Sequence, residues 1–153
     1  HWLIALMAAA SLVGGLLVLQ ATPNSDPMKP VYLRGHMAGG LVLGLLMVLR
    51  LVTRLRTARP PAAAGPALHR ASQAAHWALY LLMFAMVMTG IADLSGGTVA
   101  LPASFAVLPP HAGHELFARL LIGLILLHLL AAIWHSLKGK PVWGRMWFGR
   151  RTA

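Results

Sequence analysis

The sequence contains no cysteine and few charged residues, and each shortage excludes a class of chemistry. Without cysteine among its 153 residues, the chain forms no disulfide, binds no iron–sulfur cluster and attaches no c-type haem through thioethers. Charged residues make up 10% of the chain, whereas a soluble domain carries about 25%. Because so few polar groups cannot cover a water-exposed surface, the composition indicates a membrane protein.

Long apolar runs take the place of the missing charges. The chain is 58% hydrophobic, with a mean hydropathy of +0.71. About 20 apolar residues cross a bilayer as a helix, and four such runs are present. We therefore expect one domain, an all-α, integral membrane four-helix bundle, with spans at 2–20, 33–55, 71–94 and 113–137. The connection SGGTVALPASFAVLPPHA is apolar but rich in glycine and proline, so we expect it to lie over the membrane surface.

The formal charge of +10 gives an orientation and does not indicate nucleic acid. The basic residues cluster where apolar runs end, and are not interleaved with aromatic residues on a soluble face. Ten lie in or beside the second connection and in the C-terminal tail, against two, Lys29 and Arg34, beside the first. By the positive-inside rule the second connection and both termini are cytoplasmic.

Histidine is the second unusual feature, because polar side chains inside a membrane are costly and usually functional. Of eight histidines, His69 and His111 lie in predicted connections, where we expect solvated side chains. In the fourth span His114 and His128 are fourteen residues apart, which is ~21 Å and close to a whole number of helical turns. They therefore point the same way at two depths, and His135 follows two turns later on nearly the same face.

Each of these two depths has a partner histidine on another span. His36 is level with His114, while both His1 and His76 are near the depth of His128. Two pairs of imidazoles predict two b-type haems, with irons ~20 Å apart. The alternatives are single helix–helix hydrogen bonds and a zinc site, for which the chain offers few carboxylates. Close approach of a porphyrin or of another helix is favoured by Gly39, Gly40 and Gly44.

Taken together, these residues resemble the bacterial cytochrome b561 family, which are dihaem four-helix cytochromes of the bacterial inner (plasma) membrane. Similar cytochrome b subunits of formate dehydrogenases and hydrogenases share the layout. The matching pieces are His1-Trp2, His36 with Arg50-Leu51, HWALYLL from His76, His114-Glu115, LLHLLAAIWH, and Arg145-Met146 in the basic tail.

The resemblance implies a choice of ligands that depth alone leaves open. In the family the ligands come from spans one, two and four. This implies His1 with His128 for the cytoplasmic-side haem and His36 with His114 for the periplasmic-side haem. His76 then becomes a supporting or quinone-side residue. The sequence departs from some relatives at Gln73, where they carry a further histidine, so the role of that position is not carried over.

The resemblance further implies electron transfer between a periplasmic donor and the quinone pool. His135 would hydrogen-bond a quinone carbonyl, or it is an interfacial histidine beside Lys138. We expect Arg119 to pair with a haem propionate or with Glu115, four residues earlier, and Arg34 to pair with a propionate or to anchor the interface. One of Arg50, Arg54, Arg56 and Arg59 could hold a propionate of the cytoplasmic-side haem, although all four fit a topological role.

Two hypotheses differ in the electron donor: one makes the chain an enzyme, the other an electron-transfer subunit. Some family members oxidise superoxide and reduce ubiquinone, and Lys29, Arg34 and Arg119 would attract that anion. Alternatively the chain is a haem-bearing anchor subunit of a periplasmic dehydrogenase or hydrogenase, which would dock on TVALPASFAVLPP. A third hypothesis is a helical membrane protein without haem, such as a transporter.

Overall fold

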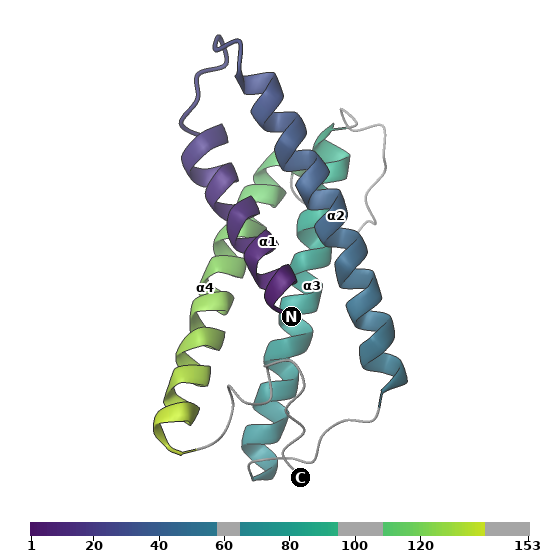
Figure 1. Cartoon of the computed structure of the whole chain (residues 1–153), viewed down its shortest axis with the longest axis vertical. Coiled ribbons are helices and arrows are strands. Elements are labelled where there is room, and N and C mark those ends of the chain that lie inside the picture. The colour runs from purple at the N-terminus through teal and green to yellow at the C-terminus, as the bar shows by residue number, and fades with distance from the viewer. Residues whose placement is uncertain (58–64, 95–108, 140–153) are drawn as a thin grey trace.

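A computed structural model of the chain describes residues 1–57, 65–94 and 109–139. Within these ranges every regular element is a helix: α1 (Trp2–Val13), which continues as the π-helix η1 (Gly14–Leu19), then α2 (Lys29–Arg56), α3 (Pro66–Leu94) and α4 (Pro110–Leu137). Four helical segments are long and apolar enough to cross a membrane. The prediction of an all-α protein with four membrane-length helices is confirmed (Figure 1).

The last three helices begin earlier than the apolar runs do, because each has a proline in its first turn. Pro30, Pro66 and Pro110 all lie within two residues of a helix start. Proline is tolerated there, since its missing N–H would have no partner inside the helix. His69 and His111 therefore lie in the first turns of α3 and α4, and placing them in connections was wrong. The segment 95–108 and the tail from 140 lie outside the described residues.

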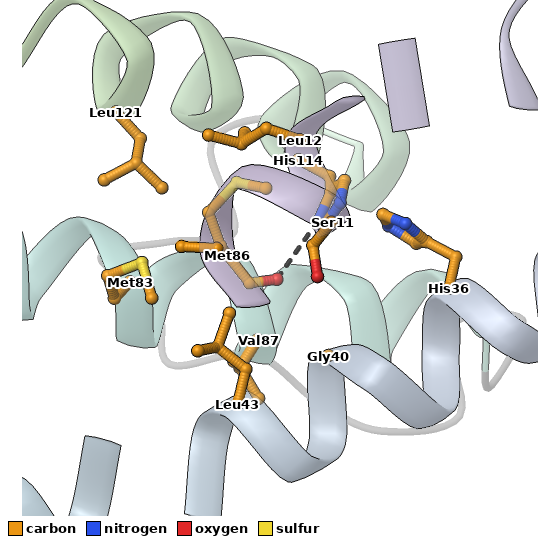
Figure 2. Close-up of a pocket in the computed structure, with 11 residues that line it drawn as sticks. Ser11, Leu12, His36, Gly40, Leu43, Met83, Met86, Val87, His114 and Leu121 are labelled. Carbon is orange, nitrogen blue, oxygen red and sulfur yellow. Dashed lines mark hydrogen bonds between the residues drawn. The ribbon is translucent and has the colours of Figure 1, made fainter. Parts of the chain in front are cut away.

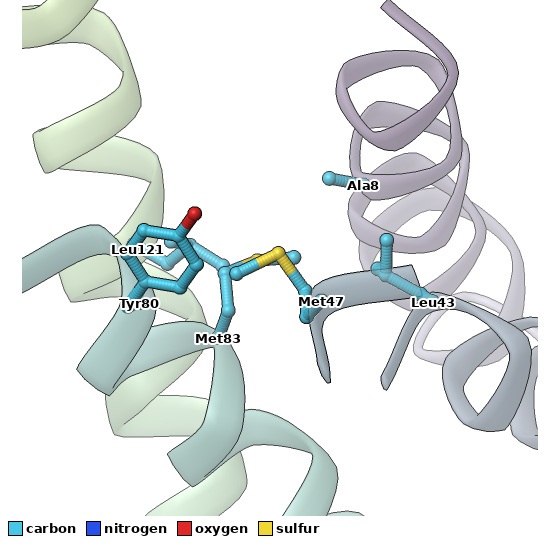
Figure 3. Packing of buried hydrophobic residues seen from close by; sticks show 6 residues of the cluster. All are labelled: Ala8, Leu43, Met47, Tyr80, Met83 and Leu121. Atoms are coloured by element: carbon cyan, nitrogen blue, oxygen red, sulfur yellow. The ribbon is translucent and has the colours of Figure 1, made fainter. Parts of the chain in front are cut away.

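Consecutive helices pack side by side and run in opposite directions (Figure 1). α1 and η1 pack on α2, α2 packs on α3, and α3 packs on α4. A core cluster joins all four helices, as Figure 3 shows, and its buried members are Ala8, Leu43, Met47, Tyr80, Met83 and Leu121. The outward faces carry large apolar side chains; Leu17 is 70% exposed and Leu130 is 63% exposed. Such surfaces suit lipid rather than water.

Candidate functional site

Residues at intervals of seven on each helix form three levels, and five of the predicted histidine and arginine candidates, His1, His36, His76, His114 and His128, lie in them. Seven residues are nearly two turns and ~10.5 Å, so residues seven apart return to one face. One set is the His114 level, formed by Gly15, His36, Gly90 and His114. Seven residues away on the same helices lies the middle layer of Ala8, Leu43, Met83 and Leu121, all of them buried. Seven further on lies the His128 level of His1, Arg50, His76 and His128.

At the His114 level two imidazoles face each other across the bundle. The ring centroids of His36 and His114 are 6.2 Å apart, with an interplanar angle of 81°, and Figure 2 shows the two rings next to each other, to the right of Leu43, Met83 and Leu121 of the middle layer. His114 donates its Nδ1–H to the carbonyl oxygen of Met86 at 3.0 Å. Its Nε2 is therefore free of hydrogen and carries a lone pair, as a histidine that binds a metal requires.

Two glycines lie directly against these imidazole rings. A Cβ atom added to Gly15 would lie 3.3 Å from Cε1 of His36, and one added to Gly90 would lie 3.3 Å from Cε1 of His114. Neither of these glycines was predicted from the sequence. Of the three that were, Gly44 packs against Val87: an added Cβ would lie 3.1 Å from Cγ1 of that valine. Gly44 therefore serves packing between helices.

The His128 level has more polar side chains. The centroids of His76 and His128 are 5.4 Å apart, at 82°, and His76 donates Nδ1–H to the Ser72 carbonyl oxygen at 2.6 Å. The positive charge of Arg50 lies near enough to His128 to interact with it electrostatically. The structure thus brings His128 beside His76, the alternative that depth left open, whereas the ring of His1 contacts Trp2 at 5.5 Å.

Two cavities border His36. One of about 60 Å³ lies between the His114 level and the middle layer, and also reaches His114 and Leu121. The other, about 390 Å³, lies between α1, η1 and α2 and is lined by small and apolar residues. Ligand pockets usually measure about 300–1,000 Å³. The second cavity therefore has the size and the apolar lining of a ligand site beside His36, but it does not reach His114, which lines the smaller cavity.

These features fit a b-type haem better than a metal ion bound by the protein alone. Imidazoles with a free Nε2, glycines beside their rings and an apolar space suit axial ligation, and no cysteine is needed. Across residues 1–57, 65–94 and 109–139, no group of three or more histidine, cysteine or acidic residues is placed to hold a metal ion. A zinc site of the usual four-ligand type is therefore absent from the described part of the chain.

The arginines and the last histidine of the predicted site lie nearer the ends of the bundle. Arg119 pairs with Glu115 at 3.2 Å, which is the second of the two partners that the sequence offered. Glu115 also accepts a hydrogen bond from Gln20 at 3.2 Å. Arg34 is exposed near the start of α2. His135 is half-buried in the last turn of α4, where Lys138 lies over the Trp134 ring at 4.9 Å.

Comparison with known proteins identifies a family over almost the whole chain. No curated protein matches the sequence, and no solved structure matches the fold. A family model described as prokaryotic cytochrome b561 matches residues 1–149. The four membrane-length helices and the paired imidazoles agree with that description. The chain therefore belongs to the prokaryotic cytochrome b561 family, which indicates a multi-pass membrane cytochrome that binds b-type haem and takes part in electron transfer.

Proposed function

We propose that this cytochrome carries electrons across the bacterial inner membrane, between a periplasmic donor and the quinone pool. The observation that carries the proposal is the pair of histidine levels on α4. His114 and His128 lie fourteen residues apart on one face, ~21 Å along the axis, and each has a second imidazole within 6.2 Å. Two carriers at these depths would span most of the ~30 Å hydrocarbon core.

The histidines divide into two ligand pairs. His36 and His114 would hold the haem at the His114 level, with Gly15 and Gly90 leaving room for their rings. At the His128 level the family pattern favours His1 with His128, while the 5.4 Å contact favours His76 as the competitor of His1. When bound, b-type haem supplies a centre that accepts and donates one electron.

The residues around the two levels would exclude water and set the orientation. The middle layer of Ala8, Leu43, Met83 and Leu121 is buried and apolar, so water is kept out between the levels. The His128 end of α2 carries Arg50, Arg54 and Arg56, which by the positive-inside rule favours the cytoplasmic side. The His114 level would then face the periplasm.

At the cytoplasmic end, His135 is the candidate quinone-side residue. It lies seven residues beyond His128, about 10 Å along α4, and it is only half-buried. An imidazole at the lipid boundary can donate a hydrogen bond to a quinone carbonyl and deliver a proton. Lys138 is directed over Trp134, so this cation is not engaged with His135.

At the periplasmic end, two kinds of donor fit the chain. Superoxide would be attracted by uncompensated positive charge, and exposed Arg34 offers it. Arg119, however, is paired with Glu115, and Lys29 donates to the carbonyl oxygen of Thr22 at 2.6 Å. Asp93, 3.3 Å from His111, adds an acidic side chain to this end of the bundle. This mixed-charge surface favours the alternative function, a haem-bearing anchor subunit that receives electrons from a docked periplasmic dehydrogenase or hydrogenase.

The test is a haem-to-protein ratio and a reduced spectrum of the detergent-purified chain, followed by addition of superoxide without any partner protein. We expect two b-type haems per chain. Fast reduction by superoxide, with a quinone as acceptor, would support a superoxide:quinone oxidoreductase, and no reduction would support the anchor subunit. A chain that is purified without a Soret band would refute both functions and favour the hypothesis of a membrane protein without haem.

A further inference from the structure

Arg54, in the last turn of α2, is held in a cage of α3 side chains. Its guanidinium carbon lies 5.0 Å from the Trp77 ring centroid and 5.4 Å from that of Tyr80. One terminal nitrogen donates to Oε1 of Gln73 at 2.8 Å. Stacking on aromatic faces and a fixed hydrogen bond hold a guanidinium in one orientation. Arg54 is therefore a positioned cation, whereas Arg56, two residues on, is exposed.

The cage leaves Arg54 incompletely satisfied. Its Nε atom is buried and has no hydrogen-bond partner within the described residues. The aromatic faces attract the charge but accept nothing from this N–H in its own plane, and Gln73 is neutral. A buried cation normally has an anionic partner. The free Nε–H marks the place where an anionic oxygen would bind.

No acidic side chain in the described part of the chain lies near that place. Its sequence holds three acidic residues, and all three lie toward the opposite end of the bundle from Arg54. Asp93 and Glu115 contact His111, and Asp26 accepts a hydrogen bond from the Met28 backbone N–H. Since no acidic side chain of the described residues reaches Arg54, we look for the anion on a bound molecule.

The position of Arg54 indicates which molecule. It lies one helical turn, ~6 Å, beyond Arg50 of the His128 level, and Tyr80, one wall of the cage, is a core residue with 6% exposure. A lipid phosphate approaches from outside the bundle, while a carboxylate group of a molecule at the His128 level approaches from inside. The buried Nε of Arg54 and the buried Tyr80 support the inside approach, while the other wall of the cage, Trp77, is 42% exposed.

We propose that Arg54, oriented by Gln73, binds a propionate carboxylate of the haem held at the His128 level. This assignment rests on the proposed function, since it needs a haem at that level. Arg54 is then a positioning residue: it touches the carboxylate but not the iron. Its positive charge favours the reduced form of that haem, so losing it shifts the midpoint potential to a lower value.

The test compares Arg54→Gln with Arg56→Gln in the full chain loaded with haem. The control removes the same charge from an exposed neighbour. We expect Arg54→Gln to lower the midpoint potential of the His128-level haem alone, and to shift the propionate bending band in the resonance Raman spectrum. The haem at the His114 level reports in the same sample that the variant is folded. Equal potentials and Raman bands in the two variants would overturn the assignment.

Two further variants sharpen the result. Gln73→Glu places a carboxylate 2.8 Å from the position of the guanidinium nitrogen, so it should draw Arg54 away and reproduce the Raman shift. Arg54→Lys keeps the charge but loses the planar fork, so the potential should recover more than the Raman band does. A Gln73→Glu variant with an unchanged Raman band would contradict the proposed contact.

Measuring tightly bound phosphorus distinguishes a phospholipid phosphate from a haem propionate as the ligand of Arg54. If Arg54→Gln loses one phosphate per chain and neither haem changes, the ligand is a phospholipid and the assignment is wrong. A wild-type chain without a haem at the His128 level would refute the proposed function together with this assignment. A wild-type chain with both haems, unchanged by Arg54→Gln, would refute the assignment alone.

Discussion

The His114 level and the His128 level are built from the same faces of the same helices, fourteen residues apart, but their surroundings differ. The first has two imidazoles and two glycines, and an added Cβ on either glycine would lie 3.3 Å from an imidazole carbon. The second combines three histidines with Arg50, and caged Arg54 lies one turn beyond. The seven-residue interval thus sets the depth at which a ligand histidine lies. The other residues of the level, glycines in one case and histidines in the other, then decide whether one pair of histidine ligands is possible or more than one.

The largest effect should come from the level with no spare ligand. His114→Ala leaves His36 without its partner at 6.2 Å, and the other two members of that level are glycines. We expect the haem content to fall from two to one per chain. The matched control is His111→Ala, one turn earlier on α4 and exposed, which should keep both haems. Two haems in His114→Ala would refute the pairing of His36 with His114.

The next largest effect concerns the His128 level, where His76 could replace His1 as the second ligand. His128→Ala should remove the second haem, because both candidate partners depend on it. In His1→Ala we expect the haem to remain, with affinity reduced by about tenfold, or about 1.4 kcal/mol, because His76 lies 5.4 Å from His128. The double variant of His1 and His76 should lose the haem.

Haem titration of the purified variants, with the low-spin spectrum as readout, checks this order. If His1→Ala loses the haem as fully as His128→Ala does, His76 cannot replace His1. If His76→Ala is the variant that loses it, the pair is His76 with His128, and the ligand choice implied by the family pattern is wrong for this chain.

A third and smaller effect tests the glycines of the His114 level. Gly90→Ala gains about 0.5–1 kcal/mol of helix stability but crowds His114 at 3.3 Å, and overpacking costs about 1–3 kcal/mol. The Met86 hydrogen bond keeps the ring from moving freely, so we expect a net loss of about 1 kcal/mol and weaker haem retention. Thermal unfolding in detergent measures the loss of stability, and the rate of haem loss measures haem retention.

The control for this substitution is Gly123→Ala on α4. An added Cβ at Gly123 has nothing within 4 Å, so only the gain in helix stability remains and haem retention should not change. If both variants behave alike, then the imidazole of His114 yields to the methyl group, and Gly90 is not needed for the site.

The sequence alone was enough for the four helices, and it predicted two levels of histidines. Four apolar runs predicted four helices, and helix rise placed His36 with His114 and placed both His1 and His76 near His128. Depth is predictable because rise per residue is constant. Helix starts were less predictable, since a proline reads as a breaker although it is tolerated in a first turn. His69 and His111 were misplaced for that reason.

The contacts across the bundle were not predictable in the same way. Which histidine meets His128 depends on how the helices are rotated and packed, and that is set by side chains such as Met83 and Leu121 rather than by the histidines themselves. Gly15 and Gly90 were missed for the same reason. Their fourteen-residue distance from His1 and His76 was the available signal. Arg54 looked like one of several topological arginines, because its Gln73, Trp77 and Tyr80 cage belongs to another helix.

The smallest expected effect concerns Thr89, the buried neighbour of His114. Its hydroxyl donates to the Ala85 carbonyl oxygen at 2.7 Å and lies 3.2 Å from Nδ1 of His114, while the threonine is only 1% exposed. Thr89→Val keeps the shape and removes the hydroxyl. Because Nδ1–H of His114 still has the Met86 carbonyl oxygen, we expect a loss of about 0.5–1.5 kcal/mol and retention of both haems.

Thr53→Val is the control for Thr89→Val, since the Thr53 hydroxyl makes the same kind of bond, to the Arg50 carbonyl oxygen at 2.8 Å, on an exposed face. It should change stability by less than about 0.5 kcal/mol. Unfolding in detergent and the haem ratio together distinguish two roles for Thr89. If Thr89→Val lost a haem as His114→Ala does, the hydroxyl rather than the backbone carbonyl would fix the imidazole. The His114 level would then depend on a side chain that a single substitution removes, and its ring would be held less firmly than that of His76, whose Nδ1–H is bonded to the Ser72 carbonyl oxygen at 2.6 Å.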